Sequence, residues 1–126
     1  MKYYLSILLV MFAFAPFAKA HHSFAVHFVA DELVEVKGVV KEFRFSNPHG
    51  VLLFTVIDEN GNEVEWRAET NSPNMLRRRG WEKDSLKPGD RITIKGFPAR
   101  KKPHYMRISH VLIEGGGELK AQAKAD

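Results

Sequence analysis

The residues with the clearest chemical potential are two adjacent histidines, His21 and His22, which directly follow a small-x-small pattern at residues 18–20. Signal peptidase reads such a pattern, so cleavage after Ala20 would leave a free α-amine on His21. An α-amine and neighbouring imidazoles form a compact set of nitrogen donors, which suits copper or another divalent metal that prefers imidazole. The sequence therefore predicts a copper site at the mature N-terminus, if the fold supplies a further ligand.

Two loop histidines are the candidates for that further ligand. His49 lies in the turn formed by residues 46–50, and His104 follows a basic loop at residues 98–103. Loops in these positions flank the ligand-binding face of an OB-type barrel. The predicted metal ligands are therefore His21, His22, His49 and His104, a set analogous to the histidine brace of copper proteins. The alternative is that His49 binds the backbone of its own turn and that His104 is a solvated loop residue.

Two basic runs are a second candidate for binding. Arg77, Arg78 and Arg79 form one run, and Arg100, Lys101 and Lys102 form the other. Together they could make a rim that binds phosphate, an anionic glycan or a lipid headgroup. Trp66 could add a stacking platform on the face of the second and third strands. The alternative is that each run is solvated, as runs of charge usually are.

Residues suited to catalysis do not form a recognisable set. The chain contains no cysteine, which excludes disulfides and thiol chemistry. Ser23, Ser72 and Ser85 lack the context of a nucleophile elbow. Glu65 and Glu69 have no spacing that indicates general acid–base work. The sequence therefore predicts no catalytic residue and favours a binding protein over an enzyme.

The first 20 residues have the features of a secretory signal. Lys2 is followed by an apolar run at residues 5–14, which is too short for a comfortable membrane span of about 20 residues. We therefore expect cleavage after Ala20, export to the periplasm or beyond, and no transmembrane anchor afterwards. Cleavage removes two of the 19 basic residues and leaves a formal charge of +2. Such a mild charge does not indicate a nucleic-acid partner.

The rest of the chain alternates between apolar and polar residues, as strands do. Residues 21–29 are expected to form an extended arm that turns at residues 30–32 and pairs with the first strand. A short helix is expected at residues 73–79, with Ser72 as its N-cap and Gly80 at its end. The five expected strands cover residues 33–45, 51–57, 64–68, 91–97 and 105–113.

This order predicts an all-β fold with one short helix, a small five-stranded OB-like barrel with an N-terminal extended arm. Gly38 interrupts the first strand and is expected to mark a bulge or a sharp coil that lets this strand serve two sides of the barrel. The barrel domain is expected to cover residues 21–114. Residues 115–126 begin with three glycines and are expected to form a flexible tail.

Short sequence blocks also carry a family resemblance. His21-His22-Ser23-Phe24, Asn47-Pro48-His49, Ser72-Pro73-Asn74 with Arg79-Gly80-Trp81, and Ser85-Leu86-Lys87-Pro88-Gly89-Asp90 occur in this order. They resemble the signature blocks of a family of small secreted bacterial proteins of unassigned function. The resemblance implies export and a single small β domain, and it implies no reaction.

Two functions therefore remain open. The first is an exported periplasmic binding protein that holds copper through the mature N-terminal histidines and the loop histidines. The second is an envelope interaction module of OB-like fold that binds an anionic glycan, a small ligand or a protein partner through its basic rim. The first should depend on the free N-terminus, whereas the second should weaken with salt.

Overall fold

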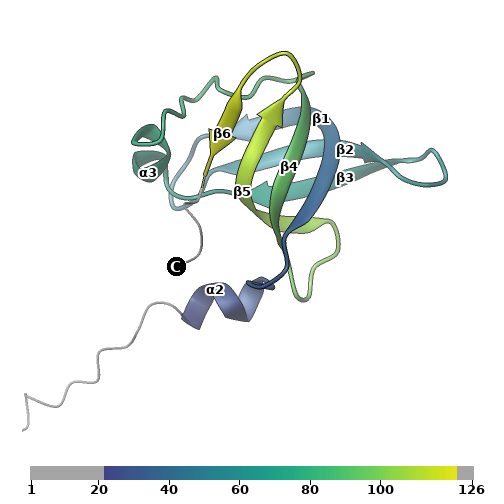
Figure 1. The fold of residues 1–126 in the computed structure, drawn as a ribbon, viewed down its shortest axis with the longest axis horizontal. Coiled ribbons are helices and arrows are strands. Elements are labelled where there is room, and N and C mark those ends of the chain that lie inside the picture. Colours follow the sequence, from purple (N-terminus) through teal and green to yellow (C-terminus); the bar gives the residue numbers. More distant parts are fainter. Residues whose placement is uncertain (1–21, 122–126) are drawn as a thin grey trace, which may run out of the picture.

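Five strands close into a barrel, which is seen in the computed structural model of residues 22–121 (Figure 1). The sheet order is β3-β2-β1-β4-β5, and a parallel pairing between β3 and β5 closes it. A short helix, α3, connects β3 to β4. The small OB-like barrel predicted from the sequence is confirmed. The strands are β1 (Val34–Arg44), β2 (Val51–Ile57), β3 (Glu63–Glu69), β4 (Arg91–Pro98) and β5 (Tyr105–Ile113).

Strand β1 serves both halves of the barrel. Its first half pairs with β4 and its second half pairs with β2. The register of the β1–β2 pair shifts between Val40 and Glu42, so the bulge lies after Gly38 and not at it. Gly38 has a different role, because a Cβ atom there would lie 2.6 Å from the carbonyl oxygen of Thr55. Only glycine allows the two backbones to approach this closely.

The inward-facing residues of the strands form one hydrophobic core, and α3 closes one part of it. Helix α3 covers Pro73–Arg77, two residues shorter than expected. Ser72 precedes it with extended backbone and makes no side-chain cap, while Gly80 adopts the expected positive φ of 83°. The largest fully buried side chains are Trp81, Phe54, Leu52, Leu76, Ile94, Met106, Ile108 and Val111.

The N-terminal segment is helical and not extended. Helix α2 covers His22–His27, and Phe28 then forms a single bridge with Ala99, so the predicted hairpin with β1 is wrong. Phe24 and Phe28 lie four residues apart, and this spacing places both rings on one side of a helix as well as on one side of a strand. Their ring centroids lie 5.3 Å apart. The sequence pattern therefore fits both conformations, and packing against the barrel decides between them.

The expected flexible tail is ordered as far as residue 121. Strand β6 (Glu118–Lys120) pairs antiparallel with β5, and Ala121 is fully buried. The preceding glycines make a tight turn, in which the Gly116 N–H donates to the Ile113 carbonyl at 3.0 Å. The glycines thus form the turn of a β-hairpin and not the start of a flexible tail. Residues 122–126 and the expected signal at residues 1–20 lie outside the described part of the chain.

The helices of the structure are both short. Between residues 22 and 121, neither has the length and apolar character that a membrane crossing requires.

Candidate functional site

A pocket of about 380 Å³ lies where α2 meets the loops between β1 and β2 and between β4 and β5. We call it the α2 pocket. Helix α2 is held there by the Arg100 Nε, which donates to the Ala25 carbonyl at 2.7 Å. The Phe28 ring stacks on Tyr105 with a centroid distance of 5.8 Å. The lining residues are Val26, His27, Phe28, His49, Glu69, Ala99, Lys101, Lys102 and Tyr105.

The wall formed by β3 and β5 carries a hydrogen-bonded polar network. The Tyr105 hydroxyl donates to Glu69 Oε1, and Glu69 Oε2 lies 3.8 Å from Arg107 Nη1. Arg107 Nη2 donates to the side-chain oxygen of Asn71. Burial, and then the bond to Glu69, raise the pKa of Tyr105 to about 12, so the phenol is neutral and acts as a donor.

Arg107 is the buried cation of this network. The residue is only 9% exposed, and its burial lowers the pKa of the guanidinium from the usual value. Its Nε is buried and has no hydrogen-bond partner among residues 22–121. A buried guanidinium requires a carboxylate or other acceptors close by, and Glu69 and Asn71 supply them. The charge of Glu69 is therefore already balanced from within the protein.

His49 joins the network from the β1–β2 loop. The Arg107 Nη1 lies 3.5 Å from His49 Nδ1. Arginine has only donors, so Nδ1 must accept and the ring proton must sit on Nε2. His49 therefore uses one ring nitrogen on the network, and its Nε2–H remains to donate to a ligand.

A second pocket of about 410 Å³ lies over β2 and β3, the face that OB barrels use for ligands. We call it the strand pocket. His104 is the only non-glycine residue with positive φ in the described chain, at 54°. Its ring packs on Trp66 with a centroid distance of 5.2 Å. The lining residues are Arg44, Leu53, Glu65, Trp66, Arg67, Lys102, Pro103, His104 and Tyr105.

Comparison with known proteins gives a family and no function. The model of a family of unknown function, DUF6152, matches residues 9–106. The chain belongs to this family. A search of curated proteins found no match. Since the description of DUF6152 names no activity, a function must come from the geometry of the site.

The predicted copper ligands of this DUF6152 member are only partly visible. His21 and the side chain of His22 lie outside the described part of the chain. His49 lines the α2 pocket and His104 lines the strand pocket, so these two side chains face different pockets. His27, the last residue of α2, lines the α2 pocket with His49. No group of three His, Asp or Glu residues placed to hold a metal ion occurs within residues 22–121.

The predicted basic rim is divided between two places. Arg77 to Arg79 belong to α3 and the turn after it, and Arg100 to Lys102 belong to the β4–β5 loop, well separated from α3 in Figure 1. Arg77 stacks over the ring of Phe45 at 5.1 Å, and Arg79 donates to the Ala121 carbonyl at 2.7 Å. The first run therefore has mainly structural partners, while Lys101 and Lys102 line the α2 pocket.

Trp66 contacts both the hydrophobic core and the strand pocket. It lies on the inward side of β3, half-buried, with its ring 6.1 Å from the ring of Phe54 in the core. It also lines the strand pocket beside His104. Trp66 is thus a wall of that pocket, and the outward positions of β3 belong to Glu65 and Arg67.

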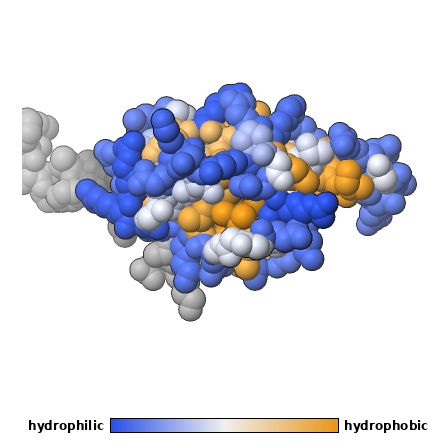
Figure 2. All heavy atoms as spheres, turned by 90° about the horizontal axis from the view of Figure 1, so that it is seen from above, coloured by the Kyte–Doolittle hydropathy of each residue, from blue (hydrophilic) through white to orange (hydrophobic). Residues whose placement is uncertain are grey.

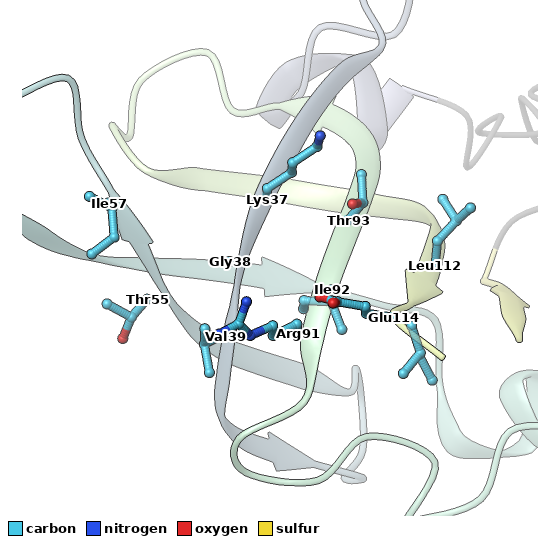
Figure 3. Close-up of a pocket in the computed structure, with 11 residues that line it drawn as sticks. Lys37, Gly38, Val39, Thr55, Ile57, Arg91, Ile92, Thr93, Leu112 and Glu114 are labelled. Atoms are coloured by element: carbon cyan, nitrogen blue, oxygen red, sulfur yellow. The ribbon is translucent and has the colours of Figure 1, made fainter. Parts of the chain in front are cut away.

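The largest hollow, about 700 Å³, is an outer groove across β2, β1, β4 and β5 (Figure 3). Figure 3 shows its side chains spread along the four strands without convergence of polar groups. Figure 2 shows hydrophobic surface between hydrophilic side chains on one face of the molecule. Val39, Ile57 and Leu112 line the groove and are 42%, 60% and 39% exposed. The groove offers apolar contact from these residues beside the charged side chains of Lys37, Arg91 and Glu114.

Three side chains of β5 and β6 form a row in the order of a nucleophile, a base and an acid. Ser109 Oγ lies 2.8 Å from His110 Nδ1, and His110 Nε2 lies 4.0 Å from Glu118. Ser109 is only 9% exposed, and neither residue lines a pocket described above. A substrate cannot reach this hydroxyl without movement of the strand, so the arrangement fits a structural role.

Sequence reasoning missed the centre of the site, which is Tyr105, Arg107 and their contact with Glu69. Tyr105 and Arg107 begin β5 and alternate with buried Met106 and Ile108. That alternation places both on the outer face of the barrel, where solvent would be the ordinary expectation. Arg107 there contacts His49 of the β1–β2 loop, Glu69 of β3 and Asn71 after β3, and no local pattern reveals these contacts.

Proposed function

We propose that this protein is an exported binding protein whose α2 pocket holds a small anionic ligand. The observation that supports the proposal most is the charge around the pocket. Lys101 and Lys102 line it without an ion pair to any carboxylate in the described chain, whereas Glu69 is already balanced by Arg107 and Tyr105. The unbalanced charge facing a ligand is therefore positive.

The neighbouring groups complete a site for an anion. His49 Nε2–H is a neutral donor, and the lysine ammonium groups donate charge-assisted hydrogen bonds. Phe28, Val26 and Ala99 offer apolar surface beside these donors. A few polar groups in a partly apolar pocket are the usual composition of a small-molecule site. The pocket thus suits a small carboxylate or phosphate that carries an apolar or ring-shaped body.

The same charges disfavour a cation in this pocket. A copper ion between His27 and His49 would lie near Arg107, Lys101 and Lys102, and like charges in a partly buried site repel strongly. Copper at the mature N-terminus stays a separate prediction that depends on His21. The two predictions can be distinguished by experiment, because addition of one residue before His21 should abolish copper binding and leave anion binding unchanged.

The test is a thermal-shift screen, followed by calorimetry, of the protein that begins at His21. The panel contains phosphate, citrate, glucuronate and benzoate, with glucose as a neutral match for glucuronate. At least one anion should bind, and Lys101→Ala with Lys102→Ala should weaken it about tenfold or more, since each charge-assisted bond is worth roughly 1.5–3 kcal/mol.

A charge-matched control separates the pocket from general electrostatics. Lys83→Ala with Lys87→Ala removes the same charge from exposed positions in the loop after α3. This control should bind as the unchanged protein does. Equal weakening in both double variants, or binding of glucose as tight as that of glucuronate, would contradict the proposal.

A further inference from the structure

The α2 pocket and the strand pocket meet at two residues that line both, Lys102 and Tyr105. The Tyr105 ring is the wall between them. Lys102 Nζ lies 5.2 Å from its centroid and Arg67 Cζ lies 5.7 Å from it, so two cations approach this one ring. Phe28 stacks on it from the side of α2. A ligand that fills one pocket therefore reaches the border of the other.

The strand pocket repeats the chemistry of the α2 pocket. Each has cations, one carboxylate and aromatic surface, with Arg67 and Glu65 in the strand pocket where the α2 pocket has Lys101 and Glu69. Arg67 has no ion pair to a carboxylate of the described chain, and Glu65 pairs with Lys41 on an exposed surface. The two pockets thus adjoin at Lys102 and Tyr105, and cations and aromatic rings line both of them.

The backbone of His104 indicates that the strand pocket is built and not incidental. A left-handed conformation is uncommon for residues other than glycine and persists only where the surroundings fix it. Here the His104 carbonyl accepts the N–H of Arg67 at 2.9 Å, which ties the β4–β5 loop to β3. The consequence is that the imidazole packs on Trp66 and completes an aromatic wall.

We infer that the two pockets are neighbouring subsites for one acidic oligosaccharide, with a uronic-acid unit in each. The inference rests on the proposed function and extends it from a small anion to a short chain. Sugar rings stack on aromatic side chains through their C–H faces, and their carboxylates pair with Lys and Arg. The carboxylates Glu65 and Glu69 would accept hydroxyl hydrogen bonds from the same sugar rings.

The two lining carboxylates also argue against a polynucleotide as the ligand. Glu65 and Glu69 line the two pockets together with the cations, so the positive charge there is sparse. A polyphosphate backbone carries a charge on every unit and nucleic-acid sites are strongly positive, whereas these pockets hold only a few cations beside two carboxylates that already have partners. A uronic-acid chain has fewer charges per length and many hydroxyl groups, which matches this mixed lining.

The test measures affinity against chain length by calorimetry, with galacturonic acid, its dimer and its tetramer as probes. A second subsite makes binding of the second unit intramolecular, so the tetramer should bind about tenfold or more tighter than the monomer. Arg67→Gln should reduce this ratio to about twofold. Arg91→Gln, the same change on an exposed position of β4, should leave the ratio as it is.

Three results would overturn the inference, and they are separable from failure of the proposed function. Equal affinity for monomer and tetramer would show that there is no second subsite, and it would leave the proposal of an anion site in the α2 pocket intact. A tetramer advantage that survives Arg67→Gln would place the extra contact elsewhere. Tighter binding of oligothymidine or of a glutamate-rich peptide than of the tetramer would change the ligand class. If no anion of the small-ligand panel binds either, the proposed function fails with the inference.

Discussion

At the scale of single residues, the site depends on how a buried cation is neutralised. Arg107 is buried at the start of β5, and Glu69, Asn71 and His49 are its partners. Once Glu69 is used in this way, the pocket has no free carboxylate to balance Lys101 and Lys102. The proposed preference for an anion therefore rests on a network of which Glu69, His49 and Tyr105 line the pocket and Arg107 and Asn71 do not.

Tyr105 gives a direct test of this network. Its folded pKa is raised from 10.0 to about 12 by burial and by Glu69, so the folded protein keeps the proton that the unfolded chain loses. This contribution to stability is fully present below pH 10 and is lost as the pH rises toward about 12. Ultraviolet absorbance of the phenolate, measured on the protein that begins at His21, should therefore show a midpoint near pH 12.

The measurement is clean because the other two tyrosines lie in the expected signal, at positions 3 and 4. Glu69→Gln should move the midpoint toward the ordinary value, since it removes the carboxylate that disfavours phenolate. A midpoint near 10 in the unchanged protein would show that Tyr105 does not donate to Glu69.

At the scale of elements, the loops that form the site are held by strands with little freedom to shift. β1 bends so that one strand pairs with both β4 and β2, and Gly38 lies in the stretch where these pairings meet. A side chain at Gly38 would lie 2.6 Å from the Thr55 oxygen and 2.8 Å from the ring of Phe54. Both neighbours are fixed in the barrel, so neither can give way cheaply.

Gly38→Ala should therefore lower the free energy of unfolding by about 1–3 kcal/mol, the usual cost of overpacking. Chemical denaturation measures this change. Gly117→Ala is the matched control, because a Cβ atom there meets nothing within 4 Å and its φ is not positive. The control should stay within about 0.5 kcal/mol of the unchanged protein. A similar loss in both variants would mean that close packing at Gly38 is not the cause.

The strands could be predicted from the sequence because their signal is local. A short apolar run predicted β2 and partial alternation predicted β5, both at their observed bounds, and the turns between strands have Pro or Gly where the backbone needs them. The pattern could not distinguish a helix from a strand in the N-terminal segment. Phe24 and Phe28 are four residues apart, and this spacing fits both conformations. Gly115 to Gly117 predict the start of a flexible tail, since a glycine-rich turn and a glycine-rich tail have the same composition.

At the scale of the whole molecule, the site could be predicted only in part. The OB-like topology predicted that the β1–β2 and β4–β5 loops flank one face and bring His49 close to His104. In the structure His49 lines the α2 pocket with Lys101 and Lys102, while His104 lines the strand pocket. The topology could not show that α2 would cover these loops or that Arg107 would become buried. These features depend on contacts between segments far apart in the chain, which no local pattern contains. Such long-range contacts also hold Arg77 to Arg79 away from the loops that line the α2 pocket.

The central claim is that an anion binds in the α2 pocket, and amide NMR spectra during titration test it most directly. The titrant is the tightest anion of the thermal-shift panel, added to the protein that begins at His21. We expect the largest shift changes to cluster at His27, His49, Lys101, Lys102 and Tyr105, while amides of α3 stay unchanged. Changes centred on Arg77 to Arg79, or on the outer groove around Val39 and Leu112, would contradict the claim.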